Sequence, residues 1–325
     1  MSSKVSKSIP IGWVVPKLLP YPMVMASTRL RVYDVIRYLR ENGLATESYR
    51  PWGGYKVVIF QKCFHKKAIR LAQKLRKKNI KVVLDINVNY IDGDPAFVTD
   101  EHRKNILDML SVCDAVITPS QYLRDLYARH HHFCFLIEEI IEDRFLSVRK
   151  MHNDIQKVMV IFCGYAIKAR EVYMIGDLIR SLYQRRKIEF TCICEKDPRL
   201  QDVPYQFVRY NHKRLPQLLL KGDIKISPRD MERKYNLGHT FTRIGYPMAV
   251  GLPVVASPLA AYKGSPALLC NTQDDWTKGL ERLISDWRYR RELGEKGQAF
   301  VRDHFTKGPI IRKYLDFFSQ VMQES

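Results

Sequence analysis

Short apolar segments of strand length alternate with amphipathic segments of helical length along this 325-residue chain. We expect short, largely apolar strands within 11–15, 56–62, 80–85, 113–118, 157–163, 189–194 and 254–256. Such strands are typical of parallel sheets covered by helices on both sides, because neither face of the sheet meets water. The alternation therefore predicts an α/β protein.

The chain is long enough for two domains with separate hydrophobic cores. The polar run 149–156 interrupts the alternation near the middle of the chain, and polar linkers of this kind are where domain boundaries fall. We therefore expect one domain at 1–148 and a second at 156–306, followed by a helix within 307–325 that is apolar on one face.

The stretch 238–257 indicates a loop, a helix, a tight turn and a strand. Gly251 is expected to end the helix, and Pro253 to precede the buried strand. A loop that leads into a helix N-terminus offers free backbone N–H groups and the positive end of a dipole, which suits a phosphate. His239 and Arg243 lie beside that N-terminus and would add positive charge. The alternative is an ordinary helix–strand unit packed in a core.

The run Met248–Ala256, M-A-x-G-x-P-V-V-A, resembles a signature in the C-terminal domain of retaining GT-B glycosyltransferases of the family-4 type. Members of that family carry a Glu-x7-Glu pattern whose second Glu holds the donor ribose, and Gly238 and Tyr246 occupy these positions here. The chain is more similar to a divergent branch that reads Lys-Ser-x-Asn-Arg before the helix, where residues 239–243 stand. The resemblance implies an α/β GT-B fold, with two Rossmann-like domains facing across a cleft and a C-terminal helix that crosses back to the N-terminal domain.

The resemblance also implies transfer of a sugar, of the hexosyl type, from a nucleotide-sugar donor to an acceptor hydroxyl with retention of configuration. The leaving diphosphate must be stabilised as its negative charge develops, and we expect helix N-termini and Arg243, as a catalytic residue, to do this without a metal or other cofactor. The loop that begins at Arg209 is implied to hold the nucleotide base. The residues expected to bind the donor are Gly164, Tyr165, Lys168, Arg209, His239, Thr240, Thr242, Arg243 and Tyr246.

A second helix N-terminus is expected near residue 27, where Ser27 or Thr28 would cap a helix with Arg29 and Arg31 in its first turn. Positive side chains at this end of a helix oppose its dipole. Either a bound anion relieves the repulsion, or the two arginines are simply solvated. In the resembling family this loop faces the cleft, and the divergent branch contains the same Ser-x-Arg-x-Arg pattern.

Polar residues also follow two of the expected strands. Ligands of open α/β sheets bind at the carboxyl ends of strands, and Asp85 and Ser120 lie at two such ends. We expect Asp85 to be a catalytic residue on the acceptor side, although it would alternatively cap a helix. The other residues expected to face the acceptor are Ser27, Arg29, Arg31, Asn87, Asn89 and Ser120.

The formal net charge of +20 predicts an anionic partner such as membrane lipid, nucleic acid or a phosphorylated substrate. The segment 62–81 is basic and amphipathic and contains no carboxylate, so it is suited to an anionic membrane surface. The alternative is a solvated outer helix. Three functions fit: an enzyme of cell-envelope polysaccharide or glycolipid synthesis with a saccharide or lipid-linked acceptor, a DNA-modifying glycosyltransferase, and a non-catalytic binding protein that kept the fold.

Cellular location is indicated by what the sequence lacks. No apolar run reaches the roughly 18 residues that span a bilayer, and prolines and Lys17 make residues 1–20 a poor signal peptide. The seven cysteines are scattered, and the pair Cys192 and Cys194 has no second pair to complete a zinc site. We therefore expect a cytoplasmic protein, with a peripheral position at the inner face of the plasma membrane if the basic helix binds lipid.

Overall fold

The computed structural model describes residues 10–16, 25–93 and 98–323, so most of the segment 1–20 lies outside the described residues. The chain divides into two compact units. The first unit contains Met1–Ile140, Arg233–Thr240 and Lys307–Ser325, and the second contains Ile141–Glu232 and Phe241–Thr306. The polar run 149–156 therefore lies inside the second unit, and residues 233–240 belong to the first.

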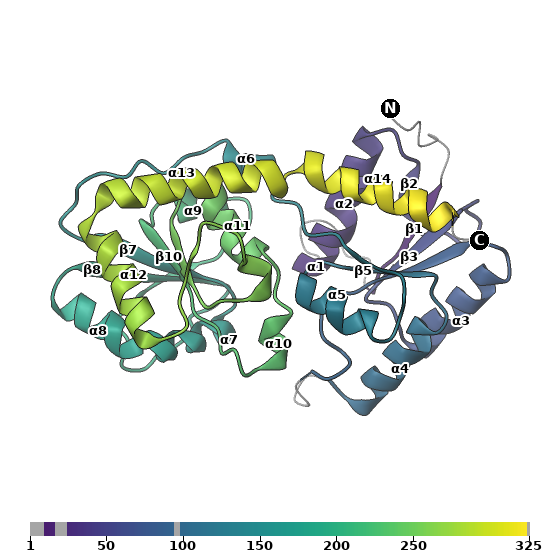
Figure 1. The fold of residues 1–325 in the computed structure, drawn as a ribbon, viewed down its shortest axis with the longest axis horizontal. Helices are drawn as coiled ribbons and strands as arrows, with labels where there is room; N and C mark the ends of the chain where they lie inside the picture. Colours follow the sequence, from purple (N-terminus) through teal and green to yellow (C-terminus); the bar gives the residue numbers. More distant parts are fainter. Residues whose placement is uncertain (1–9, 17–24, 94–97, 324–325) are drawn as a thin grey trace. The chain divides into compact units, whose positions relative to one another are not determined.

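Each unit is built on its own parallel sheet of six strands (Figure 1). The first sheet has the order β2-β1-β3-β4-β5-β6. Its strands are β1 (Ile11–Val14), β2 (Thr46–Ser48), β3 (Val57–Gln61), β4 (Lys81–Asp85), β5 (Ala115–Thr118) and β6 (Cys134–Leu136). Every neighbouring pair in this sheet is parallel. The central strands β3 and β5 are buried along their whole length, as the uniformly apolar pattern predicts.

Helices cover both faces of the first sheet. Apolar residues of α2 (Asp34–Glu41) and α14 (Lys307–Gln323) share one core with β1 and β3. On the other face, α3 (Lys66–Arg76), α4 (Asp100–Leu110) and α5 (Gln121–Ala128) share a second core with β3 and β4. The C-terminal helix α14 therefore belongs to the core of the unit in which the chain begins.

The helical segment that ends in α2 begins differently from the prediction. It starts at Ala26 as α1 (Ala26–Thr28) and continues through a π-helical stretch, η1 (Arg29–Tyr33). Met25 occupies the N-cap position, and no side chain caps the helix. Ser27 and Thr28 lie within α1, so the prediction that one of them is the N-cap is wrong. A π-helical stretch widens the helix locally and is frequent at functional sites.

The second sheet has the order β12-β11-β10-β7-β8-β9, and all its neighbouring pairs are parallel. Its strands are β7 (Val158–Cys163), β8 (Ile188–Cys194), β9 (Gln206–Arg209), β10 (Ile224–Ser227), β11 (Val254–Ala256) and β12 (Leu268–Leu269). The helices of this unit are α6 (Asp143–Leu146), α7 (Ala166–Ala169), η2 (Arg170–Ile175), α8 (Gly176–Gln184), α9 (Leu215–Leu219), α11 (Thr242–Ala249), η3 (Ala260–Tyr262), α12 (Gln273–Ser285) and α13 (Trp287–His304). The remaining short helix, α10 (Lys234–Leu237), belongs to the first unit.

Two glycines of α13 allow it to pack closely against α11. A Cβ atom on Gly294 would lie 2.1 Å from the carbonyl oxygen of Gly251, and one on Gly297 would lie 3.2 Å from the Met248 side chain. Gly251 itself has a φ of +83°, which ends α11 as predicted. Close packing of these two helices holds α11 against the second sheet.

Within the described ranges, no helix is both long enough and apolar enough to cross a bilayer. All seven cysteines are free thiols.

Candidate functional site

The second unit brings two of the predicted phosphate-binding features together at the carboxyl end of β7. Gly164 follows this strand, and Arg243 is the second residue of α11. A Cβ atom on Gly164 would lie 3.8 Å from Nη1 of Arg243 and 3.2 Å from the ring of Phe162. The guanidinium group therefore lies over the turn between β7 and α7, where the missing side chain of Gly164 leaves the backbone accessible. We call this group, which consists of Gly164, the Phe162 ring and the guanidinium group of Arg243, the Gly164 site.

Arg243 lies in the first turn of α11. Phe241 occupies the N-cap position in helical conformation, and its side chain makes no cap hydrogen bond. Thr242, the first residue of α11, is buried, whereas Arg243 is half-buried. A helix N-terminus with a cation in its first turn favours an anion near these groups.

Three further predicted donor residues of the second unit lie outside α11. Tyr165 is 54% exposed and precedes α7, which contains the half-buried Lys168. The amide of Ala166 at the start of α7 donates to Oε2 of Glu195 at 2.9 Å, so a carboxylate already occupies part of this helix end. Arg209 is exposed at the end of β9.

Tyr246 occupies the position of the second glutamate of the resembling family. Its ring lies on the ring of Phe145, with 4.3 Å between the ring centroids and 35° between the ring planes. An aromatic pair of this kind stabilises the contact between α6 and α11. A phenol cannot accept two hydrogen bonds in the manner of a carboxylate, so the structure offers no equivalent of that glutamate here.

His239 and Thr240 belong to the first unit, whereas Thr242 and Arg243 belong to the second. Thr240 Oγ1 donates to Oε2 of Glu139 at 2.7 Å, and the ring of His239 lies edge-on to Tyr235 at 5.4 Å. The predicted donor loop is thus divided between the two units.

Sequence reasoning missed two buried cations close to the Gly164 site. Lys225 lies in the middle of β10, with its Nζ atom 5.1 Å from the centroid of the Phe162 ring. The guanidinium carbon of Arg229 lies 5.9 Å from the same centroid. The available signal was a lysine between two isoleucines in an otherwise apolar strand.

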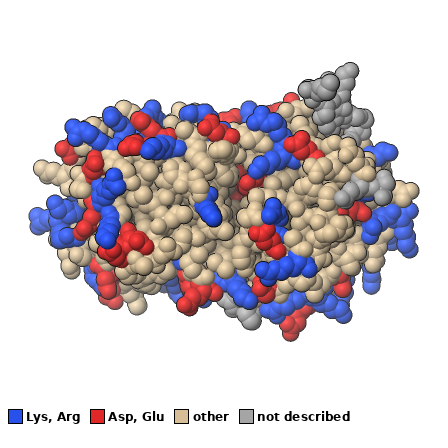
Figure 2. Space-filling model, viewed as in Figure 1, with Lys and Arg blue, Asp and Glu red and all other residues tan. Residues whose placement is uncertain are grey.

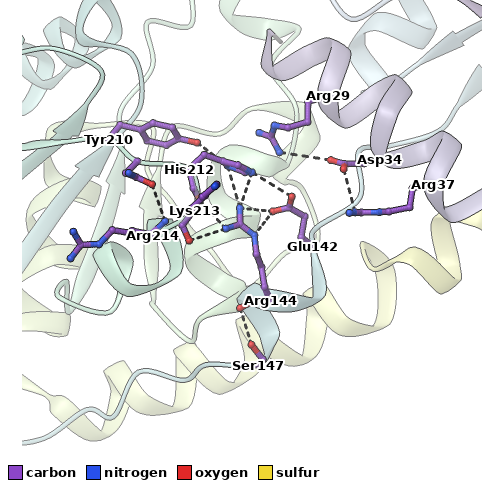
Figure 3. A network of polar contacts seen from close by, with 11 residues as sticks. Arg29, Asp34, Arg37, Glu142, Arg144, Ser147, Tyr210, His212, Lys213 and Arg214 are labelled. Atoms are coloured by element: carbon purple, nitrogen blue, oxygen red, sulfur yellow. Dashed lines mark hydrogen bonds and ion pairs between the residues drawn. The ribbon is translucent and has the colours of Figure 1, made fainter. Parts of the chain in front are cut away.

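A polar network holds the loop that follows β9. Nη1 of Arg144 donates to the carbonyl oxygens of His212 at 2.8 Å and Lys213 at 3.1 Å, and Nε donates to Glu142 at 2.7 Å. Figure 3 shows Glu142, Arg144 and His212 pointing toward one another. Burial opposes ionisation of Glu142, but the hydrogen bond from His212 and the charge of Arg144 lower its pKa to about 2. The loop implied to hold the nucleotide base is therefore anchored by charged groups.

In the first unit, Asp85 and Arg31 form a fully buried ion pair. Nε and Nη2 of Arg31 donate to the two carboxylate oxygens at 3.0 and 2.9 Å, and Nη1 donates to the carbonyl oxygen of Ile137 at 2.6 Å. Burial raises the pKa of Asp85, although Arg31 acts to lower it. Asp85 ends β4 and caps no helix. Neither its predicted catalytic role nor the capping alternative has support in this geometry.

Arg29 is also balanced by a carboxylate. Its Nη1 atom lies 3.8 Å from Asp34, and Asp34 in turn accepts from Arg37 at 3.2 Å (Figure 3). Arg29 and Arg31 are both buried, so the alternative of two solvated arginines is wrong. Of the residues predicted around this helix start, only Ser27 is not buried, and it is half-buried.

The three remaining acceptor-side residues differ in how their polar groups are used. Asn89 Oδ1 accepts from the amides of Ile91 and Asp92, which closes the loop after β4. Ser120 caps α5 by accepting from Leu123 at 3.4 Å. Asn87 Oδ1 is buried without a hydrogen-bond partner among the described residues, which makes Asn87 the candidate with unused hydrogen-bonding capacity.

No group of three or more His, Cys, Asp or Glu side chains is placed to hold a metal ion in the described part of the chain. The run 92–94 reads Asp-Gly-Asp, a pair of carboxylates that the prediction of no metal site overlooked. Asp92 interacts with Asn89 at 2.5 Å and with Lys234 at 3.2 Å. Asp94 lies outside the described residues.

Comparisons with known proteins give the fold but no family. No protein-family model matches the chain, and no curated protein matches it by sequence. Among solved structures, the chain is similar to a sucrose-phosphate synthase from Thermosynechococcus elongatus, with a TM-score of 0.70 and 13% identity over 98% of this chain and 100% of that one. A glycosyltransferase from Rickettsia africae is similar with a TM-score of 0.69 and 11% identity, over 98% and 99% of the two chains. TarM is similar with a TM-score of 0.61 and 13% identity, over 81% of this chain and 54% of TarM.

The two parallel six-stranded sheets and these similarities establish the architecture. The chain has the α/β fold of the GT-B glycosyltransferases.

Proposed function

We propose that this protein is a glycosyltransferase that moves a sugar from a nucleotide-sugar donor to an acceptor hydroxyl. The observation that carries the proposal is the Gly164 site, where the guanidinium group of Arg243, a residue of the first turn of α11, lies next to the turn at the carboxyl end of β7. Ligands of parallel α/β sheets bind at such ends. The arrangement suits a diphosphate, which needs backbone N–H donors and a cation.

The proposed mechanism places the leaving diphosphate of the donor at the Gly164 site. Arg243 and the first amides of α11 stabilise the negative charge that develops as the bond to the sugar breaks. Lys168, one turn into α7, adds a second cation. The reaction proceeds with retention and without a metal, and Asn87 contributes a hydrogen bond to the acceptor.

Two structural neighbours support a nucleotide and a saccharide as ligands. The catalytic domain of starch synthase IV from Arabidopsis thaliana was solved with ADP and acarbose, and it is similar with a TM-score of 0.58 and 9% identity. TarM from S. aureus was solved with UDP and α-GlcNAc-glycerol, with a TM-score of 0.58 and 13% identity.

Gly238 and Tyr246 favour a second candidate, a non-catalytic binding protein with the same fold. Both stand where the resembling family has glutamates, and the Tyr246 ring packs on Phe145. A thermal-shift screen of nucleoside diphosphates and nucleotide sugars separates the two candidates, because a ligand that binds only the folded state raises the melting temperature. A selective shift with one base supports the transferase. No shift with any nucleotide, in a sample that melts cooperatively, would favour the binding protein.

We further propose that the enzyme acts at an anionic membrane, on a lipid-linked or saccharide acceptor of envelope polysaccharide or glycolipid synthesis. Seven exposed cations lie in and just after α3, and Figure 2 shows Lys and Arg side chains gathered over this part of the first unit. They are Lys66, Lys67, Arg70, Lys74, Arg76, Lys77 and Lys78. The apolar side of α3 is packed in the core, so the contact with lipid would be electrostatic and sensitive to salt.

Vesicle binding tests this part of the proposal. Replacing Lys66, Lys67, Lys74 and Lys78 by Gln should reduce binding to phosphatidylglycerol vesicles by on the order of tenfold or more, because each cation near such a surface contributes about 1 kcal/mol. A matched control changes the same amount of charge on the second unit, with Gln at the exposed positions Lys187, Lys196, Lys221 and Lys263. Equal binding by the two variants would remove the role of α3. Tight, salt-dependent binding of duplex DNA without vesicle binding would favour the nucleic-acid alternative.

A further inference from the structure

A lysine is buried at the centre of the second sheet. Lys225 is 1% exposed and lies in β10, between the neighbouring strands β7 and β11. Its Nζ atom donates to the carbonyl oxygen of Ile226 and faces the ring of Phe162. An ammonium group at such a position is costly unless an anion is near it.

The groups that face Lys225 supply no anion. Cys163 lies at the end of β7, Cys192 and Cys194 lie in β8, Arg229 follows β10, and Arg243 lies in α11. Burial raises the pKa of Cys163 to about 11 and that of Cys194 to about 12, and it also raises the pKa of Cys192. These thiols are therefore uncharged at neutral pH. No carboxylate in the described part of the chain forms an ion pair with Lys225.

Lys225 is consequently poised between its two protonation states. Burial lowers the pKa of Lys225 to about 7, and the charges of Arg229 and Arg243 act in the same direction. The ordinary pKa of a lysine is 10.5. A nearby negative charge has the opposite effect, because it favours the protonated amine.

Arg229 provides an independent sign that the cluster is built for an anion. Its side chain is 1% exposed and pairs with Glu171, yet its Nε atom is buried without a hydrogen-bond partner among the described residues. Lys225 and Arg229 both lie near the Phe162 ring, and that ring lies beside Gly164, over which Arg243 is placed. Lys225 and Arg229 thus lie by the Phe162 ring, and Arg243 lies by the neighbouring Gly164. Among the described residues, Arg229 forms an ion pair with Glu171, and Lys225 forms an ion pair with no carboxylate.

We propose that Lys225, Arg229 and Arg243 form the cationic base of a diphosphate site at the Gly164 turn, and that Lys225 takes up a proton when the diphosphate binds. This inference rests on the proposed function, because it places the donor diphosphate at the Gly164 site. Lys225 does not contact the ligand. Its positive charge acts on the bound anion at a distance, through the electric field, so Lys225 is a positioning residue.

Proton uptake makes the affinity for diphosphate depend on pH. In the empty protein above pH 7, most Lys225 side chains are neutral. The bound anion restores the ammonium form, so binding must draw a proton from solvent. Affinity should therefore fall as the pH rises from 6.5 to 8.5, over and above any change in the charge of the ligand itself.

Isothermal titration calorimetry with inorganic pyrophosphate tests the proposal. Wild-type protein, Lys225→Met and the exposed control Lys221→Met are titrated at pH 8.0 in two buffers that differ in ionisation enthalpy, and again at pH 6.5 and 8.5. The protonation of pyrophosphate is common to all three proteins and cancels in the comparison. We expect the wild type and Lys221→Met to take up most of one proton more than Lys225→Met does. Between pH 6.5 and 8.5 their affinity should fall by about tenfold more than that of Lys225→Met.

Two results would contradict the proposed role of Lys225. Equal proton uptake and equal pH dependence in the wild type and Lys225→Met would overturn the proposal, as would the absence of pyrophosphate binding at millimolar concentration. Methionine fits an apolar strand, and Lys225→Gln serves as a second variant without a titratable amine if Lys225→Met does not melt cooperatively.

The inference and the proposed function fail separately. If nucleoside diphosphates bind but the Lys225 variants show wild-type proton uptake, the role of Lys225 is lost and the transferase proposal stands. If pyrophosphate binds with proton uptake that depends on Lys225 but no nucleotide binds, the anion site stands and the transferase proposal is lost.

Discussion

At the scale of single residues, burial determines how the charged side chains of this protein act. Arg31 and Asp85 are fully buried and satisfy each other, while Lys225 is equally buried and pairs with no carboxylate among the described residues. The first arrangement stabilises a native structure once formed, although assembling it is costly. The second arrangement leaves the amine of Lys225 able to gain or lose a proton near neutral pH. The cost of removing a charge from water is thus met by an ion pair in the first unit, whereas in the second unit it favours the neutral form of a lysine.

Removing one partner of the Arg31–Asp85 pair should be strongly destabilising. We expect Asp85→Ala to lower the free energy of unfolding by about 3–5 kcal/mol, because it leaves the Arg31 guanidinium buried without its counter-ion. The control Asp100→Ala breaks the exposed pair with Arg103 and should cost less than about 1 kcal/mol. Urea denaturation measures both. A loss below 1 kcal/mol for Asp85→Ala would contradict the structural role of the pair.

The stability of the second unit should depend on acid pH through Glu142. Its pKa in the folded protein is about 2, below the ordinary value of 4.5. The carboxylate therefore stabilises the fold above pH 4.5, and this contribution of about 3 kcal/mol is lost as the pH falls toward 2. We expect the difference in stability between the wild type and Glu142→Gln to be largest near pH 6 and to shrink steadily below pH 4.5. A difference that is constant from pH 6 to pH 3 would show that the charge of Glu142 is not what stabilises the loop.

At the scale of elements, the glycines of α13 explain a sequence pattern that propensity alone does not. A helix interior normally disfavours glycine, yet Gly294 and Gly297 are both buried within this 18-residue helix. They stand where any side chain would meet α11 and the Gly251 turn after it. This contact supports the helix that carries Arg243 of the Gly164 site.

We expect Gly294→Ala to destabilise the protein by about 3 kcal/mol or more, because its Cβ atom would meet the backbone oxygen of Gly251. Gly279→Ala, in α12, is the matched control. A Cβ atom there makes only ordinary contacts, the nearest at 3.6 Å, so the control should be neutral or stabilising by about 0.5–1 kcal/mol. Thermal or urea unfolding measures the pair. Equal stability of the two variants would mean that α13 and α11 do not pack as described.

Local sequence predicted the strands well, but it predicted the helix start near residue 27 wrongly. The strands are short, apolar and buried, so their pattern depends little on distant residues. The helical segment that follows Gly164 is divided into α7, η2 and α8. Glu171 in η2 turns inward to pair with Arg229, a residue 58 positions away. The local sequence does not predict such a pairing. It likewise did not predict that Arg29 and Arg31 are buried and paired with carboxylates.

At the scale of the whole molecule, the alternation of strands and helices was sufficient to predict an α/β chain with two Rossmann-like halves, and the GT-B fold is confirmed. The chain passes between the units more than once, because 233–240 and the C-terminal helix both return to the first. These returns depend on side-chain packing, such as the burial of Tyr314 and Phe317 with β1 and β3. A predicted boundary based on polarity alone could not locate them.

Only some residues of the candidate site were named from the sequence, because the others depend on contacts between distant parts of the chain. Gly164 and Arg243 are far apart in sequence, and the fold brings them close together. Their role in binding a donor stays a prediction. Lys225 and Arg229 were missed because buried cations have no characteristic spacing in a sequence.

The central claim is that the Gly164 site binds the diphosphate of a nucleotide. The most direct test is an equilibrium titration of Arg243→Ala with the nucleoside diphosphate that the thermal-shift screen selects. We predict a loss of affinity of about ten- to a hundredfold, as expected for a charge-assisted hydrogen bond, with an unchanged melting temperature in the absence of ligand. Arg302→Ala, which removes an exposed arginine from α13, should bind as the wild type does. Unchanged affinity in Arg243→Ala would contradict the account.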